Sequence, residues 1–144
     1  MAAVILTTLA GTVIQSQFNL AAIQGLGAEL SIADWLWVTV QDLGAFSPVY
    51  FIIILATFLL AIPAAALAVR LIGSARQGLY MGGTALGLFV ALQVIDHLVP
   101  MPTLIAATRS LPGMAFMLAA AAAGGWLFAA MTSATRLSQH RNAS

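Results

Sequence analysis

The chain has 144 residues, enough for one domain, and 62% of them are hydrophobic whereas only 6% are charged. An average soluble domain carries about 25% charged residues, so these few charges cannot cover a water-exposed surface. The formal net charge of +1 gives no basic footprint for nucleic acid, and the absence of cysteine excludes disulfides and thiolate metal sites. We therefore predict an all-α integral membrane protein, a single domain over residues 1–144 that forms a bundle of four transmembrane helices.

The first predicted span covers residues 3–22 and is the weakest of the four. Its first half is apolar, but Gln15, Ser16, Gln17 and Asn19 follow, and polar groups that face lipid cost free energy. Either the helix continues with these groups turned toward protein, or it leaves the membrane near Gln15. We expect the first arrangement. A helix packed inside a larger complex would tolerate this polarity, whereas a lipid-exposed helix would not.

Residues 32–45 are predicted to form a short amphipathic helix at the membrane interface, between the first two spans. Ser31 stands three residues before Asp34, which is typical of a helix N-cap with an acid in the first turn. Asp34 and Asp42 share one helical face, which we expect to be solvated, and large apolar side chains lie mainly on the other. Such a helix either caps the bundle or serves to dock a partner or gate a substrate.

The other three spans are predicted at residues 48–69, 79–99 and 111–131. Each is an apolar run of about the 20 residues that cross a hydrocarbon core of about 30 Å. Pro63 lies inside the second span and predicts a kink, either static or used as a hinge. Four aromatic residues near the expected headgroup zones are predicted interfacial anchors. They are Trp35, Trp37, Tyr50 and Tyr80.

The arginines predict the orientation of the bundle. Arg70 and Arg76 lie between the second and third spans, and two more lie in the tail, residues 132–144, whereas Arg109 alone lies on the opposite side. The positive-inside rule then places both termini, and the tail, in the cytoplasm. The alanine-rich, lysine-free composition indicates a high-GC bacterium, so the predicted location is the bacterial inner membrane.

Two of the predicted spans carry small residues at four-residue spacing, which allows helix backbones to approach closely in lipid. These residues are Gly83 and Gly87 in the third span, and Ala115, Ala119, Ala123 and Gly124 in the fourth. We expect both stripes to form helix contacts inside the bundle. A seam between two copies of the chain is the alternative.

Asp96 and His97 are the main candidates for chemistry. Asp96 is the single acid within a membrane-length segment, and an ionisable group at that depth is a functional hypothesis by default. Gln93 lies one turn away, and Arg109 in the following outer loop is a candidate ion-pair partner. Three interpretations stay open: an interfacial ion pair, a proton or ion site, and a contact to a quinone or lipid headgroup.

The sequence carries no catalytic motif and identifies no family. We therefore expect a non-catalytic accessory or scaffold subunit of a larger membrane complex, with no cofactor beyond a bound lipid or quinone. Its partners would be the lipid bilayer and either other membrane subunits or further copies of the chain. One alternative is a small homo-oligomeric transporter or channel that uses Asp96 and His97 near its outer mouth. Another is a protein that handles lipid or quinone within the membrane.

Overall fold

The computed structural model describes residues 1–73, 75–98 and 105–142, with side chains up to Ser133. Within these residues it has five α-helices and one short 3-10 helix. They are α1 (Ala2–Gly25), α2 (Ile32–Ala45), α3 (Ser47–Ile72), α4 (Arg76–Leu98), η1 (Ala106–Arg109) and α5 (Leu111–Asn142). The all-helical prediction is confirmed. The last residue of the predicted 79–99 span lies outside the described residues, as do residues 143–144 of the predicted tail.

Among the described residues, three helices are long and apolar enough to cross a membrane: α3, α4, and α5 over Leu111–Ser133. Helix α1 is not among them, although its 24 residues give it a sufficient length. Its glutamines, Ser16 and Asn19 lower the hydropathy of its second half. A membrane location is thus supported by three helices, and a fourth span stays a prediction.

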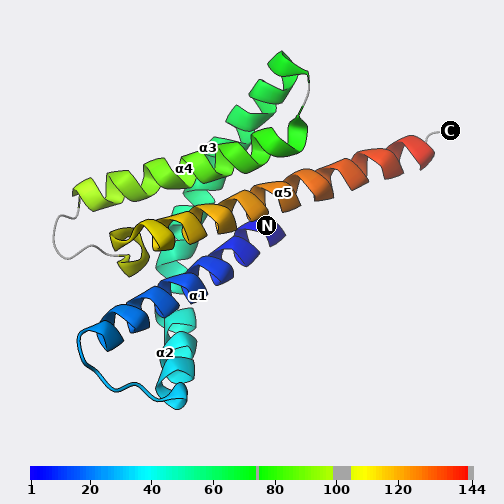
Figure 1. Ribbon diagram of the computed structural model, residues 1–144. Helices are drawn as coiled ribbons and strands as arrows, with labels where there is room; N and C mark the ends of the chain where they lie inside the picture. The colour runs from blue at the N-terminus through cyan, green and yellow to red at the C-terminus, as the bar shows by residue number, and fades with distance from the viewer. Residues whose placement is uncertain (74, 99–104, 143–144) are drawn as a thin grey trace.

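The helices pack in two layers (Figure 1). Helices α1, α5 and α4 lie side by side, with α5 in the middle and running opposite to both neighbours. Helix α3 crosses behind this layer and contacts α1 near its own start and α4 near its own end. The side of α5 that faces away from α3 is therefore not covered by another helix of this chain.

Helix α2 begins as predicted and leads directly into α3. The hydroxyl of Ser31 accepts the N–H of Asp34 at 3.2 Å, and the Asp34 carboxylate accepts the N–H of Ser31 at 2.9 Å. The hydrogen bond from the Ser31 hydroxyl lowers the pKa of Asp34 below its ordinary value. At the other end Phe46 keeps a right-handed helical backbone, so α2 meets α3 without a loop. That α2 lies on a membrane surface stays a prediction.

Helix α1 turns its polar side chains inward. Its buried polar residues are Thr7, Thr8, Thr12, Gln15 and Ser16. Its exposed large apolar residues include Ile5, Leu6, Leu9 and Val13. The helix continues without interruption past Gln15 to Gly25, and Gln15 and Ser16 are turned toward protein as expected. That this stretch crosses the membrane stays a prediction.

The Gly83 and Gly87 stripe packs against α3. A Cβ built on Gly83 would lie 3.2 Å from the Cβ of Ala65, and one built on Gly87 would lie 3.1 Å from the Cβ of Ala61. Gly124 likewise meets another helix, because its Cβ would overlap Thr7 of α1. For these three glycines the predicted close helix contacts are confirmed.

The prediction is wrong for the alanine stripe of α5. Ala115, Ala119 and Ala123 are all exposed on the uncovered side of that helix. The face of α5 that is buried carries other residues: Gly113, Met117, Ala121, Gly124, Gly125 and Ala129. Alanine is apolar enough to face either protein or lipid, so four-residue spacing alone does not decide which face of a helix is inside.

Two of the predicted aromatic anchors are buried instead. Tyr50 is fully buried, its ring stacked on Phe46 and its hydroxyl 3.9 Å from the sulfur of Met117. Tyr80 is 7% exposed and packs against Phe128. Both tyrosine rings pack against side chains of the bundle. Hydropathy does not predict such contacts.

The structure does not contradict the predictions made for Trp35, Trp37 and Pro63. Trp37 is exposed and Trp35 half-buried, so both stay candidate anchors. Helix α3 continues through Pro63, which lies inside it. The choice between a static kink and a hinge at Pro63 stays open.

Candidate functional site

A buried polar cluster joins α1 to α2, α3 and η1, and we call it the polar seam. It consists of Thr12, Gln15, Ser16, Asp42, Ser47 and the backbone N–H of Ala107. The hydroxyls of Thr12 and Ser47 are 2.9 Å apart, and the hydroxyl of Ser16 lies 2.6 Å from the Asp42 carboxylate. The side-chain oxygen of Gln15 accepts the N–H of Ala107 at 2.8 Å.

The polar seam changes the interpretation of two earlier expectations. Asp42 is half-buried against α1, which corrects the expectation that it is solvated, whereas Asp34 is exposed as predicted. Gln15, Ser16 and Gln17 all have partners within this chain, the last through the hydroxyl of Thr39 at 3.1 Å. The polarity of α1 therefore no longer requires another subunit. The sequence showed that these groups needed partners but not which residues would supply them.

The Ser16 hydroxyl has two acceptors but only one proton. Its oxygen lies 2.6 Å from Asp42 and 3.0 Å from the carbonyl oxygen of Thr12. The hydroxyl of Ser16 donates to the Asp42 carboxylate in a short, charge-assisted hydrogen bond. With a single carboxylate and no second acid or base in hydrogen-bond contact, the seam fastens α2 to α1 and has no catalytic pair.

The candidate residues at the end of α4 do not converge. Asp96 follows Leu88 and Leu92 at four-residue spacing on the inner side of α4, and it is half-buried. His97 and Gln93 are exposed on a different side of the same helix. A helix rotates by about 100° per residue, so Asp96 and His97 face different directions although they are adjacent in sequence.

Asp96 has one buried oxygen without a hydrogen-bond partner. This is its Oδ1 atom, for which the described part of the chain offers no donor. The expected ion pair with Arg109 is not formed among the described residues, in which Arg109 is the exposed last residue of η1. The structure therefore gives no support to Asp96 as half of that ion pair, and the role of Asp96 stays a prediction.

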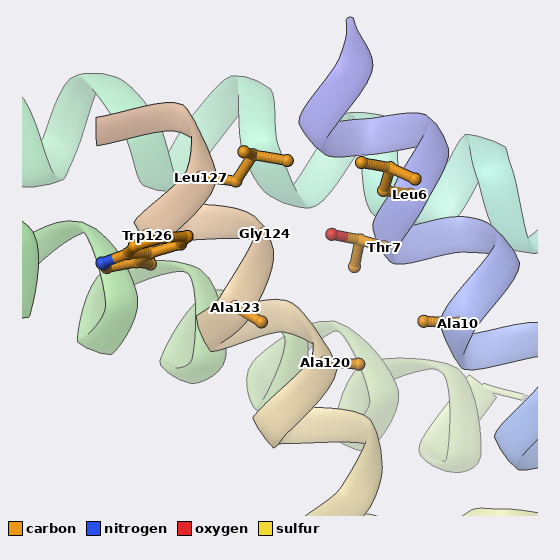
Figure 2. Close-up of a pocket in the computed structure, with 8 residues that line it drawn as sticks. All are labelled: Leu6, Thr7, Ala10, Ala120, Ala123, Gly124, Trp126 and Leu127. Atoms are coloured by element: carbon orange, nitrogen blue, oxygen red, sulfur yellow. The ribbon is translucent and has the colours of Figure 1, made fainter. Parts of the chain in front are cut away.

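An apolar groove of about 360 Å³ lies between α1 and α5 (Figure 2). It is lined by Leu6, Thr7, Ala10, Ala120, Ala123, Gly124, Trp126 and Leu127. The hydroxyl of Thr7 points toward Gly124 and has no hydrogen-bond partner in the described structure. Such a groove suits an apolar chain or the side chains of another helix, and no charged group lies in it.

Neither the polar seam nor the end of α4 assembles a metal site or a catalytic set. In the part of the chain that the structure describes, no three His, Asp or Glu side chains gather where they could hold a metal ion. The chemistry available is hydrogen bonding within the bundle and apolar contact outside it. Comparison with protein-family models, with curated proteins and with solved structures finds no match to this chain.

Proposed function

We propose that this chain is a four-span protein of the bacterial inner membrane and a non-catalytic accessory subunit of a larger membrane complex. The observation that carries the proposal is the outward-facing alanine stripe of α5, formed by Ala115, Ala119 and Ala123. It lies beside the groove between α1 and α5, on the side of α5 that no helix of this chain covers.

Support for the fourth span comes from the side-chain distribution of α1. This helix buries threonine, serine and glutamine and exposes leucine, isoleucine and valine, which is the reverse of what water favours. It also lies along α5, with Thr7 at Gly124, and Gln15 bonds to Ala107 of η1, just before α5 begins. Because its buried polar groups other than Thr7 have hydrogen-bond partners inside the protein, α1 can face lipid at small cost.

Support for a partner helix comes from the size of the exposed residues on α5. Helices associate in lipid mainly through close packing, and small side chains permit the shortest approach. The larger Phe116 and Trp126, both exposed, lie near the two ends of the alanine stripe and bracket it. A helix of another subunit would lie on the alanines between these two aromatic rings.

Leucine at Ala119 should therefore release the partner while leaving the chain folded. The experiment is native mass spectrometry after gentle detergent extraction, comparing wild type with Ala119→Leu. We expect wild type to carry a larger membrane subunit and the variant to lose most of it, because the added side chain holds the helices apart. Ala64→Leu, at an exposed alanine of α3, is the matched control and should keep the partner. Recovery of wild type as a monomer or homo-oligomer would overturn the proposal.

A second candidate function rests on Asp96, whose Oδ1 atom is buried without a partner. In that case the chain is a small transporter or channel, and the carboxylate binds the transported proton or cation. In reconstituted vesicles Asp96→Asn should then reduce flux at least tenfold, since the isosteric amide keeps the shape but not the charge. His97→Gln, on the exposed side of α4, should change flux little. Equal flux from Asp96→Asn and wild type removes this candidate.

A further inference from the structure

Arg76, the first residue of α4, holds its guanidinium against the end of the spanning part of α5. One terminal nitrogen donates to the carbonyl oxygen of Ala129 at 3.1 Å and also to the hydroxyl of Ser133. The other donates to the hydroxyl of Thr132 at 2.6 Å. The guanidinium carbon lies 5.5 Å from the centre of the Tyr80 ring. The charged group is therefore fixed in place and half-buried.

None of these contacts neutralises the charge, because all three acceptors are neutral oxygens. The chain has only four carboxylate side chains, and all of them, Glu29, Asp34, Asp42 and Asp96, lie in the described residues. None forms an ion pair with Arg76 there. Asp96 lies twenty residues further along α4, about 30 Å at 1.5 Å per residue. A half-buried cation without a counter-ion is unfavourable, and the described residues supply none, so this position favours an anionic ligand.

A second cation lies at the same end of the bundle. Arg70 is exposed in the last turn of α3, and residues 73–75 join that helix to Arg76. The end of α3, the start of α4 and the end of the spanning part of α5 thus meet at one corner. The large apolar side chains of Leu71 and Ile72 are exposed there, with 78% and 61% of their surface accessible. Positive charge and exposed apolar surface are combined at this corner.

We propose that this corner, defined by Arg70 and Arg76, binds the phosphate group of an anionic phospholipid. A guanidinium has five N–H donors, and the three bonds to α5 leave two for a bidentate contact to phosphate oxygens. Leu71 and Ile72 offer contact to acyl chains. A free phosphate ion would match the charge but would leave these apolar side chains without a ligand. The inference rests on the membrane setting of the proposed function, and not on the accessory role.

The test measures how lipid changes the thermal stability of the full chain in a neutral detergent. Phosphatidylglycerol, phosphatidylcholine and inorganic phosphate are each titrated against wild type. We expect phosphatidylglycerol to stabilise the protein at much lower concentration than either of the others. Arg76→Gln should weaken the apparent affinity for phosphatidylglycerol by roughly tenfold or more, since a charge-assisted contact is lost. Arg109→Gln removes an equal charge elsewhere and should leave that affinity unchanged.

Arg70→Gln provides a second variant, because Arg76→Gln also removes the bonds to α5 and can reduce stability by itself. Arg70 is exposed and makes no such bonds in the described structure, so its loss should weaken phosphatidylglycerol binding without lowering stability in detergent alone. Equal stabilisation by phosphatidylcholine, or an equal effect of inorganic phosphate, would overturn the proposal. So would a preference for phosphatidylglycerol that both variants keep. A chain recovered in the soluble fraction would instead refute the membrane setting, and lipid binding without a copurified partner would refute only the accessory role.

Discussion

Gly125→Ala is expected to lower the stability of the bundle by about 1–3 kcal/mol, the usual cost of overpacking. A Cβ at this position would overlap the hydroxyl of Thr84 and the backbone carbonyl of Tyr80 on α4. The backbone atom cannot rotate away, so α4 and α5 must separate. This separation would also strain the bond from the Thr84 hydroxyl to the Ala121 carbonyl, now 2.8 Å long. Unfolding of the purified protein in detergent, followed by circular dichroism, measures the change.

Gly82→Ala is the matched control for this prediction. Gly82 lies in α4, and a Cβ built on it meets nothing within 4 Å. Alanine also has a better helix propensity than glycine, by up to about 1 kcal/mol. The control should therefore be as stable as wild type or slightly more stable. If Gly125→Ala matched Gly82→Ala in stability, the close contact between α4 and α5 at Gly125 would be wrong.

Gln15→Leu should cost the protein about 1–3 kcal/mol, the penalty for leaving a buried donor unsatisfied. The Gln15 side chain is the partner of the N–H of Ala107, a fully buried residue at the second position of η1. Leucine occupies a similar volume but accepts no hydrogen bond. Water cannot easily replace the lost acceptor, since Gln15 itself is only 7% exposed. The denaturation midpoint in detergent should fall, and η1 should become more accessible to proteolysis.

Gln24→Leu tests whether this loss is specific to the contact. Gln24 lies on the same helix but is exposed, so the same substitution should change stability by no more than about 0.5 kcal/mol. If both variants behaved alike, the lower stability would reflect a general effect of polarity on α1. In that event the bond between Gln15 and Ala107 would contribute nothing measurable.

Local patterns were sufficient to predict the helices and some of their ends. Residues 32–45 form α2 as expected, because the capping residues Ser31 and Asp34 act within a single turn of helix. The apolar runs gave α3, α4 and α5 in the correct order. The glycines at 83 and 87 were correctly expected in a close contact, because few residues other than glycine fit where two backbones approach.

The inner face of each helix was harder to predict than its extent. In a soluble protein the apolar face is the buried one, but in a chain that is 62% hydrophobic almost every face is apolar. Hydropathy then gives no sign of which side of α5 packs, and the alanine stripe was assigned to the wrong side. Tyr50 was misplaced for a related reason. Its burial depends on Gly11 of α1, where any Cβ would overlap the Tyr50 ring.

The candidate site was predictable as a list of residues but not as an arrangement. Asp96, His97 and Gln93 were identified from their rarity in an apolar segment, and the structure places Asp96 on a different side of α4 from the other two. The polar seam was not predicted, because Ser16 and Asp42 are 26 residues apart and come from different helices. The unneutralised charge of Arg76 likewise appears only once the positions of all four carboxylates are known.

By itself, the sequence determined the helical class, the extent of the apolar segments, and the separation of Arg70 and Arg76 from most of the acids. These properties follow from composition and from interactions within one or two turns of a helix. Only the tertiary structure decided which face of each helix is buried, which partners satisfy the polar groups of α1, and which surface of α5 stays uncovered. These features depend on contacts between residues that are far apart in sequence. In a uniformly apolar chain, hydrophobicity does not distinguish the buried face of a helix from the exposed one, but the fit between side chains does.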